Sequence, residues 1–372
     1  MMSFSESKIR DARILVVGCG ALGNEVLKGL ALAGAAHLVL VDFDVVEKSN
    51  LARSVLFRKE DADAGRLKVD AAAQRLLDIN PSLDITTICG DVAWDVGLGH
   101  FIDADVVIGC VDSRWARYCI NRLCMRAGRP WVDGAIEGLE GTARVFAPGR
   151  NCYACNLGPH GLEELRRRMP CSGVIRREER AGHVPTTGIA ASVIGAVQVQ
   201  EAMKLIDPDA LPEDASLLGR MFHYDGAFTT AQTADFKAYD DDCPVHDQWG
   251  PVFASPLDAD STVEEALSFV ASETRSPQPA FFLHDDCFVD FVEEKNGGRS
   301  HRVMLPGRKV EGFVEGHERL RSLPLSALSQ SEFRRIDGSF PYKELTLKEL
   351  GIPGRDVLKA RAQDATFYYQ IG

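Results

Sequence analysis

The sequence lacks a long hydrophobic run near its N-terminus. The first ten residues, MMSFSESKIR, are polar, and the first apolar run, Ile14–Val17, has four residues. A signal peptide needs an apolar core of roughly seven residues or more, and a membrane-spanning helix needs about twenty. We therefore expect a cytoplasmic protein that does not enter a membrane.

Positive charge is also in short supply. The 42 Lys and Arg residues face 54 Asp and Glu residues, for a formal net charge of -12. A nucleic-acid surface needs clustered Lys and Arg to replace counterions. We exclude nucleic acid as a partner. Repeats and low-complexity tracts are missing too, and 45% hydrophobic with 26% charged residues is typical of a globular protein.

At 372 residues, the chain is longer than one hydrophobic core usually supports. Asp, Pro, Gly and Ser gather in residues 235–262, a composition typical of a linker. We predict a first domain over residues 1–254 and a second over residues 255–372.

Short β-branched runs alternate with helix-period segments from Arg13 to Ile108. The runs are ILVV, HLVLVD, ITTI and VVI, and PWVDG and TARVFA extend the series. This alternation predicts βαβ units, and so an α/β, Rossmann-like domain with a mostly parallel sheet. Charged, irregular sequence over about 158–185 predicts an exposed excursion before a helix at residues 188–206.

A glycine-rich turn follows the first predicted strand. Gly18, Gly20 and Gly23 form G-x-G-x-x-G directly before a helix pattern, and Asp42 ends the next strand. Such glycines let the backbone approach phosphate at a helix N-terminus, while the acid accepts hydrogen bonds from a ribose. A nicotinamide-dependent dehydrogenase would fit this fingerprint equally well.

The segment after Asp42 is more specific. It carries Asp44, Asn50 and Arg53, and Lys68 follows at a helix start. An adenylating enzyme must neutralise a triphosphate and its transition state, which a dehydrogenase need not do. The alternative is a solvated, charged loop.

Residues 13–206 resemble the superfamily of ubiquitin-activating and molybdopterin- or thiamine-type sulfur-carrier-activating enzymes. The resemblance implies ATP and magnesium as cofactors. It places the following residues in the nucleotide site: Gly18, Gly20, Ala21 and Gly23 at the phosphates, Asp42 at the ribose with Asp44 beside it, Asn50, Arg53 and Lys68 at the phosphates and the incoming carboxylate, and Asp112 at magnesium, in a pattern completed by Arg117 and Asn121.

Two features depart from that family. Ser54 stands where the family motif N-L-x-R-Q has Gln, and only twelve residues precede Arg13, whereas many homodimeric relatives carry an N-terminal arm with an arginine for the partner's site. We leave open whether the chain forms a homodimer or a heterodimer.

Two short pairs offer metal ligands, Cys152-x-x-Cys155 and Cys243-x-x-His246. Four nitrogen and sulfur ligands suit a tetrahedral structural zinc site. The resemblance supports zinc, although relatives commonly have two Cys-x-x-Cys pairs at these places. The alternative is that His246 is a surface histidine.

Cys171 lies in the charged excursion, between Arg166–Arg168 and Arg176–Arg177. Cationic neighbours lower the pKa of a thiol and favour the nucleophilic thiolate. Relatives that pass their protein to a conjugating enzyme carry the thioester cysteine in this crossover region. A buried, inert cysteine is the alternative. Cys19, Cys110, Cys119 and Cys124 fall within strand, turn or helix patterns and predict packing roles.

Residues 262–372 resemble the small α+β ubiquitin-fold (β-grasp) domain that ends the catalytic subunits of eukaryotic ubiquitin-like activating enzymes. In those enzymes the domain recruits a conjugating enzyme. An oligomerisation module is an alternative. A fused modifier is disfavoured because a single Gly372 follows Ile371.

The sequence therefore predicts an enzyme that adenylates the C-terminus of a ubiquitin-like modifier, forms a thioester at Cys171 and transfers the modifier to a conjugating enzyme. Arg53, Lys68 and Asp112 would also serve the catalytic step. The alternatives are a sulfur-carrier adenylyltransferase without an essential thioester and a nucleotide-binding regulatory subunit. The compact single chain fits neither large eukaryotic enzyme fully, so a bacterial ubiquitin-like system stays open as its source.

Overall fold

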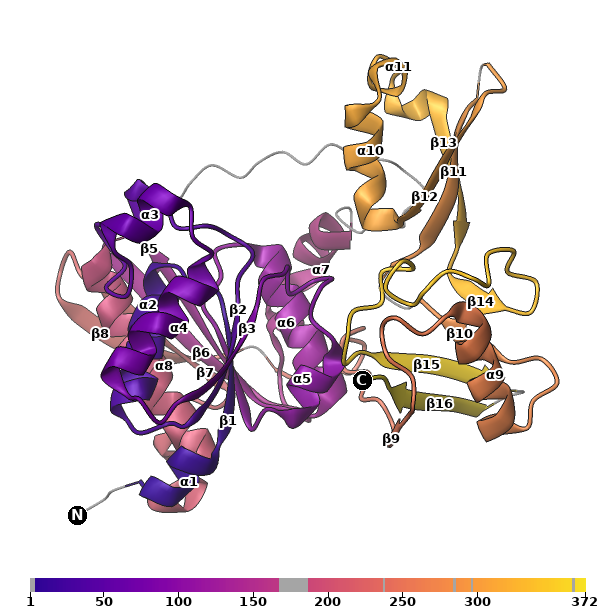
Figure 1. Cartoon of the computed structure of the whole chain (residues 1–372). Helices are drawn as coiled ribbons and strands as arrows, with labels where there is room; N and C mark the ends of the chain where they lie inside the picture. The colour runs from indigo at the N-terminus through magenta and orange to yellow at the C-terminus, as the bar shows by residue number, and fades with distance from the viewer. Residues whose placement is uncertain (1–3, 167–186, 237, 284–285, 296, 363–364) are drawn as a thin grey trace. The chain divides into compact units, whose positions relative to one another are not determined.

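The computed structural model describes most of the chain, namely residues 4–166, 187–236, 238–283, 286–295, 297–362 and 365–372. These residues form two compact units (Figure 1). The second consists chiefly of Trp249–Gly372, and the first holds most of the residues before it.

An eight-stranded sheet forms the centre of the first unit, in the order β3-β2-β1-β4-β5-β6-β7-β8. Strands β1 to β5 pair in parallel, whereas β6, β7 and β8 join antiparallel. The strands are β1 Arg13–Val17, β2 His37–Val41, β3 Asp84–Ile88, β4 Val106–Gly109, β5 Trp131–Glu137, β6 Glu140–Phe146, β7 Arg220–Asp225 and β8 Thr230–Asp235. The predicted α/β class with a Rossmann-like sheet is confirmed, with an antiparallel extension at one edge.

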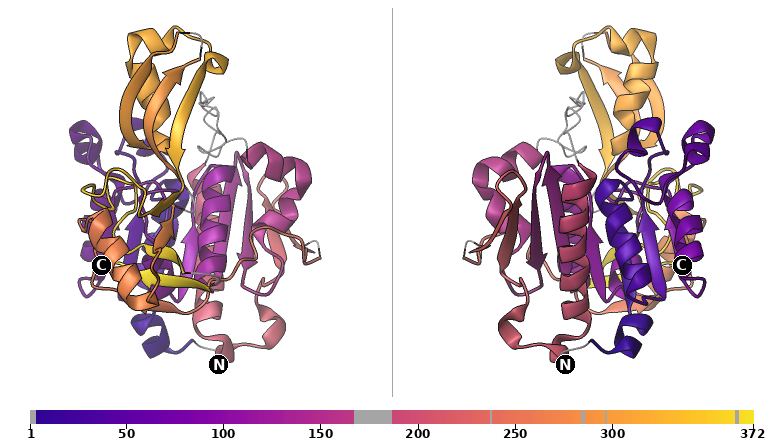
Figure 2. Two further views of the ribbon diagram at one scale, coloured as in Figure 1. Left: turned by 90° about the vertical axis from the view of Figure 1, so that its right-hand side faces the viewer. Right: turned by 90° about the vertical axis from the view of Figure 1, so that its left-hand side faces the viewer.

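Helices cover both faces of this sheet (Figures 1 and 2). Helices α2, α4 and α8 pack together on one face, where α8 contacts β4, β5 and β6, and α6 contacts β4 and β5 on the other. The helices that precede Trp249 in the chain are α1 Glu6–Asp11, α2 Ala21–Leu32, α3 Lys59–Ala64, α4 Lys68–Ile79, α5 Leu98–Asp103, α6 Arg114–Ala127, α7 Tyr153–Arg166 with a kink at Gly158, and α8 Gly188–Ile206.

Local sequence explains where these elements lie. Residues Ile14–Val17 of β1 are all buried, as expected for a parallel strand covered on both faces. Helix α6 begins where the Ser113 hydroxyl accepts a hydrogen bond from the Ala116 N–H at 3.0 Å, and it ends at Gly128 in the left-handed conformation.

Helix α8 is the one described helix that is long and apolar enough to span a membrane. It lies against α2 and three strands of the sheet, and Ala190, Ile194 and Ala202 are buried. This packing accounts for its apolar composition without a membrane.

The second unit contains two sheets. The larger has the order β14-β10-β15-β16-β9 and contacts α9 through β10, and the smaller has the order β12-β11-β13 and contacts α10 through β12. The elements are β9 Val252–Ala254, α9 Val263–Thr274, β10 Ala280–Phe282, β11 Phe288–Glu294, β12 Ser300–Pro306, α10 Val310–Gly316, α11 Glu318–Arg321, β13 Leu328–Phe333, β14 Arg335–Asp337, β15 Val357–Ala362 and β16 Ala365–Gln370.

This α+β arrangement is larger than one small sheet with a helix. Phe281, Phe288 and Leu347 belong to one core of the unit, and Val289, Val310 and Leu320 belong to another. The ubiquitin fold expected for residues 255–372 stays a prediction, as does the domain boundary at residue 255.

Candidate nucleotide and metal sites

The glycine turn lies between the end of β1 and the start of α2. Gly18 has a φ of 95°, and a Cβ there would lie 2.6 Å from the Cys110 carbonyl oxygen, so only glycine fits. A Cβ on Gly23 would lie 1.9 Å from the Gly18 oxygen. Gly20, the N-cap of α2, instead faces open space. The N-terminus of a twelve-residue helix is therefore accessible to an anion.

Asp42 connects this turn to the segment after β2. Its Oδ2 accepts a hydrogen bond from the Cys19 N–H at 2.7 Å, and its Oδ1 accepts one from the Asp44 N–H at 2.8 Å. Burial raises the pKa of Asp42, and nearby Lys68 opposes that shift. The carboxylate retains lone pairs for a further donor such as a ribose hydroxyl.

Lys68 begins α4 and reaches back to the same segment. Its Nζ lies 2.7 Å from Asp44 Oδ2, and its backbone N–H donates to the Asp44 carbonyl at 2.9 Å. Four of the predicted nucleotide-binding residues, namely Gly18, Asp42, Asp44 and Lys68, thus lie around the ends of β1 and β2.

Asn50 and Arg53 lie on the following turn. The Asn50 side chain accepts a hydrogen bond from the Glu47 N–H at 2.9 Å, and Arg53 Nη1 donates to the Ser49 carbonyl at 2.8 Å. These contacts shape the turn itself. Next to Arg53, Ser54 is 5% exposed and its hydroxyl has no hydrogen-bond partner among the described residues.

The sequence did not single out Asn24, although its side chain connects the glycine turn to the backbone at Leu56. It is fully buried, and its Nδ2 donates to the carbonyls of Cys19 at 2.7 Å and Gly20 at 3.0 Å. Its Oδ1 accepts from the Leu56 N–H at 2.7 Å. The only sequence signal was a polar residue on the inward side of an apolar helix.

Asp112 follows β4, on the same edge of the sheet as the glycine turn, because Cys110 N–H bonds to the Val17 carbonyl at 2.7 Å. Its side chain is exposed. An exposed carboxylate at a strand end suits magnesium, which keeps several waters and takes one or two carboxylates. Arg117 and Asn121, by contrast, are buried, and Asn121 Oδ1 accepts hydrogen bonds from Trp131 Nε1 and the Tyr153 N–H.

The four predicted metal ligands come together. The ligand atoms of Cys152, Cys155, Cys243 and His246 all lie within 4.8 Å of one another. Sulfur separations are 3.6 Å between Cys152 and Cys155 and 3.8 Å between Cys152 and Cys243, and His246 Nε2 lies 3.3 Å from Cys155 Sγ. Tetrahedral zinc with bonds of about 2.3 Å to sulfur separates two sulfurs by about 3.8 Å.

The surroundings of this cluster also suit a cation. The three cysteines are buried, and the His246 ring stacks on Tyr239 at a centroid distance of 4.3 Å. The hydrogen bond between Cys152 and Cys243 lowers the pKa of Cys152 and raises the pKa of Cys243. His246 is thus a member of the cluster, which a free surface histidine would not be. The residues fit a bound metal ion.

The predicted nucleophile lies outside the described residues. Cys171 and the arginines at 167, 168, 176 and 177 belong to the stretch 167–186, so its role stays a prediction. The cysteines assigned to packing, Cys19, Cys110, Cys119 and Cys124, are all buried. Burial raises the pKa of the Cys110 and Cys124 thiols, which disfavours a thiolate at either.

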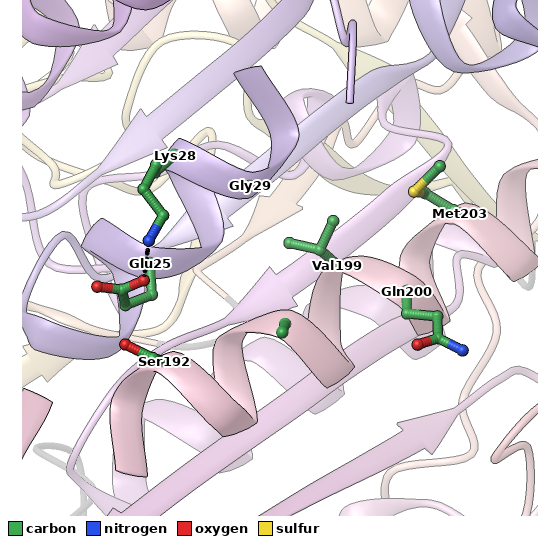
Figure 3. Close-up of a pocket in the computed structure, with 8 residues that line it drawn as sticks. Glu25, Lys28, Gly29, Ser192, Val199, Gln200 and Met203 are labelled. Carbon is green, nitrogen blue, oxygen red and sulfur yellow. Dashed lines mark hydrogen bonds and ion pairs between the residues drawn. The ribbon is translucent and has the colours of Figure 1, made fainter. Parts of the chain in front are cut away.

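A pocket of about 310 Å³ lies between α2 and α8 (Figure 3). Val199 and Met203 line it together with the paired side chains of Glu25 and Lys28. The residues predicted to bind nucleotide do not line it, so we do not assign the nucleotide to this pocket.

Comparison with known proteins identifies the class to which this fold and site belong. Residues 4–245 match the model of the ThiF family, and the chain is therefore a member of that family. The match covers the large sheet, the predicted nucleotide-binding residues and three of the four predicted metal ligands, and it ends one residue before His246.

Two curated relatives are similar over most of their own length. The chain is 33% identical to the SAMP-activating enzyme E1 of Haloferax volcanii over 247 residues, which are 66% of this chain and 84% of the relative. It is 32% identical to the sulfur carrier protein ThiS adenylyltransferase of Escherichia coli over 203 residues, which are 54% of this chain and 74% of the relative.

Among solved structures, Escherichia coli MccB with ATP has a TM-score of 0.51 at 21% sequence identity, covering 64% of this chain and 68% of that chain. At this identity the likeness concerns the fold.

Proposed function

We propose that this chain is an ATP-dependent adenylyltransferase that activates the C-terminal carboxylate of a small ubiquitin-like or sulfur-carrier protein. The observation that carries the proposal is the gathering of the glycine turn, Asp42, Asp44 and Lys68 at one edge of the sheet, with Asp112 at the end of β4. The names of the two relatives, an activating enzyme and an adenylyltransferase, support it.

Each residue has a role in this proposal. The N–H groups at the start of α2 bind phosphate oxygens beside Gly20, and Asp42 accepts hydrogen bonds from the ribose. Lys68 and Arg53 neutralise charge as a carboxylate oxygen of the substrate protein bonds to the α-phosphorus. The bond from that phosphorus to the bridging oxygen then breaks, and pyrophosphate leaves.

The proposal includes two metal ions with different roles. Asp112 would hold magnesium, which offsets the negative charge of the phosphates when bound. Cys152, Cys155, Cys243 and His246 would hold zinc, which has no part in the reaction and stabilises the start of α7 against the segment after β8.

The proposal extends to a thioester. The Cys171 thiolate would attack the carbonyl carbon of the acyl-adenylate, forming a carbon–sulfur bond and releasing AMP. Support comes from the five arginines that flank Cys171 in the sequence. A conjugating enzyme that docks on residues 255–372 would then receive the modifier. In the competing version, a sulfur carrier is adenylated and Cys171 forms no essential thioester.

A non-reducing gel separates these versions. The purified chain is incubated with ATP, magnesium and a ubiquitin-like protein that ends in a free glycine carboxylate. The thioester version gives a thiol-sensitive adduct that disappears in Cys171→Ala and persists in Cys89→Ser, a matched variant at an exposed cysteine. Adenylation without an adduct favours the sulfur-carrier version.

A regulatory nucleotide-binding subunit would give neither a thiol-sensitive adduct nor an adenylated protein. A nicotinamide dehydrogenase predicts that NAD, rather than ATP, raises the melting temperature, because a ligand stabilises the state that binds it. We expect ATP to raise it in the presence of magnesium, and we expect the protein to act in the cytoplasm.

A further inference from the structure

The strand beside β4 carries a buried acid that the nucleotide site does not use directly. Asp133 lies on β5, opposite Gly109 of β4, and its side chain is fully buried. Its Oδ1 accepts a hydrogen bond from Arg117 Nε at 3.0 Å, and its Oδ2 is paired with Arg144. Two cationic partners offset the cost of burying this carboxylate.

Arg117 uses its remaining N–H groups on backbone carbonyls. Its Nη2 donates to the Val111 carbonyl at 2.5 Å and to the Gly134 carbonyl at 3.2 Å, and its Nη1 lies 3.4 Å from the Asp112 carbonyl. Two of these three carbonyls belong to the short segment between β4 and α6. A planar guanidinium with fixed donor directions can hold that segment in one conformation.

Asp112 depends on this support. Its exposed carboxylate makes no hydrogen bond or ion pair with any residue that the structure describes, so the backbone, which sets the direction of the Cα–Cβ bond, is what limits where the carboxylate can reach. The Ser113 cap fixes the helix side of the segment, and Arg117 fixes the strand side.

We propose that Asp133 is a positioning residue for the metal-binding carboxylate: it orients Arg117, and Arg117 holds the backbone that carries Asp112. The inference rests on the proposed function, because that function assigns Asp112 to a divalent cation. It adds a residue on a neighbouring strand that does not touch the cation or the nucleotide.

The test measures binding of Mn²⁺, as a probe for magnesium, to the full chain with a non-hydrolysable ATP analogue, by electron paramagnetic resonance. We expect Asp133→Asn to raise the Kd for Mn²⁺ about tenfold, the lower range for loss of a supporting contact around a metal ligand. Arg117→Lys keeps the positive charge beside Asp133 but removes the planar guanidinium that also bonds to the Val111 carbonyl. We expect the same increase in the Kd for Mn²⁺. Arg144→Gln leaves the contacts to Val111 and Asp112 in place and should have a smaller effect.

A matched control comes from the second unit. Asp286 is 9% exposed and pairs with Arg308 at 2.7 Å, so Asp286→Asn also neutralises a buried acid beside an arginine. It should leave the Kd for Mn²⁺ unchanged. If Asp133→Asn does not fold, Arg117→Lys decides the question alone. Wild-type affinity for Mn²⁺ in a folded Asp133→Asn or Arg117→Lys variant would overturn the inference.

The readout separates this inference from the proposed function, because binding of Mn²⁺ requires no turnover. Weakened binding in both variants, in a chain that adenylates no protein, would support the positioning role and contradict the function. Unchanged binding in Asp112→Asn would overturn the positioning role, whereas adenylation could persist.

Discussion

Lys68 Nζ lies 2.7 Å from Asp44 Oδ2, and the two side chains differ sharply in exposure, at 11% for Lys68 and 51% for Asp44. The lysine is therefore held in place by its buried stem, while its partner is on the solvent side. A bound phosphate could replace Asp44 as the partner without a large movement of Lys68, because an ammonium group binds any nearby anion as a point charge.

The first prediction concerns this lysine. Lys68→Ala should lower the rate of ATP–pyrophosphate exchange by about a hundredfold, since removal of one preorganised group that stabilises transition-state charge has roughly that effect. The matched variant is Lys59→Ala, which removes a 74% exposed lysine paired with Asp63. Equal exchange rates in the two variants would exclude Lys68 from the site.

Asn24 should couple stability to nucleotide binding. Asn24→Ala leaves the buried Leu56 N–H and the Cys19 carbonyl without this partner, whereas the Gly20 carbonyl keeps the backbone N–H of residue 24, and the change should lower the free energy of unfolding by about 3 kcal/mol. Urea denaturation measures this loss. Asn80→Ala, at a partly buried asparagine that donates to Ala35, should cost less. ATP should stabilise Asn24→Ala less than the wild-type chain; equal stabilisation would show that Asn24 does not shape the phosphate site.

The metal cluster predicts a bound ion. The purified chain should contain about one zinc ion, and a chelator should lower its melting temperature, because binding energy at a structural zinc site contributes to folding. Elemental analysis checks the first point and a thermal melt the second. Cys152→Ser should lose the metal, whereas Cys89→Ser, at an exposed cysteine, should keep it. A metal-free wild-type chain that melts at the same temperature with and without chelator would contradict the assignment.

Acid should destabilise the second unit through Glu294. Hydrogen bonds from Arg319 and His301 lower the pKa of Glu294 from 4.5 to about 2. The folded state thus binds this proton less readily than the unfolded state. The stabilisation is fully present above pH 4.5 and is lost as the pH falls toward 2.

Glu294→Gln should flatten the dependence of the melting temperature on pH over that range. Glu344→Gln, at an exposed residue, should keep the wild-type slope. A Glu294→Gln variant with the full wild-type slope would show that other groups cause the acid sensitivity.

The sequence predicted the first unit well where local signals were strong. The helix predicted over residues 188–206 begins and ends as α8 does, and the side chain of Thr187 caps its start. Strands β7 and β8 were not predicted, because every residue of β7 is half-buried and every residue of β8 is exposed, so neither shows a clear alternation.

In the candidate sites, too, residues with a local sequence signal were predicted, and residues whose contacts are distant in the sequence were missed. The metal cluster followed from two pairs of short spacing, and its geometry agrees with that prediction. Asn24 and Asp133 were missed because their partners lie 32 and 16 residues away along the chain, and only the fold brings them together. The three-stranded sheet of the second unit was missed for a similar reason, since β11 pairs with both β12 and β13.

The most direct test of adenylation is exchange of labelled pyrophosphate into ATP in the presence of a candidate ubiquitin-like or sulfur-carrier protein. Our account predicts exchange that requires magnesium, the chain and a free C-terminal glycine carboxylate, and that disappears when that carboxylate is amidated. Absence of exchange with every such protein, while ATP still binds and raises the melting temperature, would contradict the account and favour a regulatory nucleotide-binding subunit.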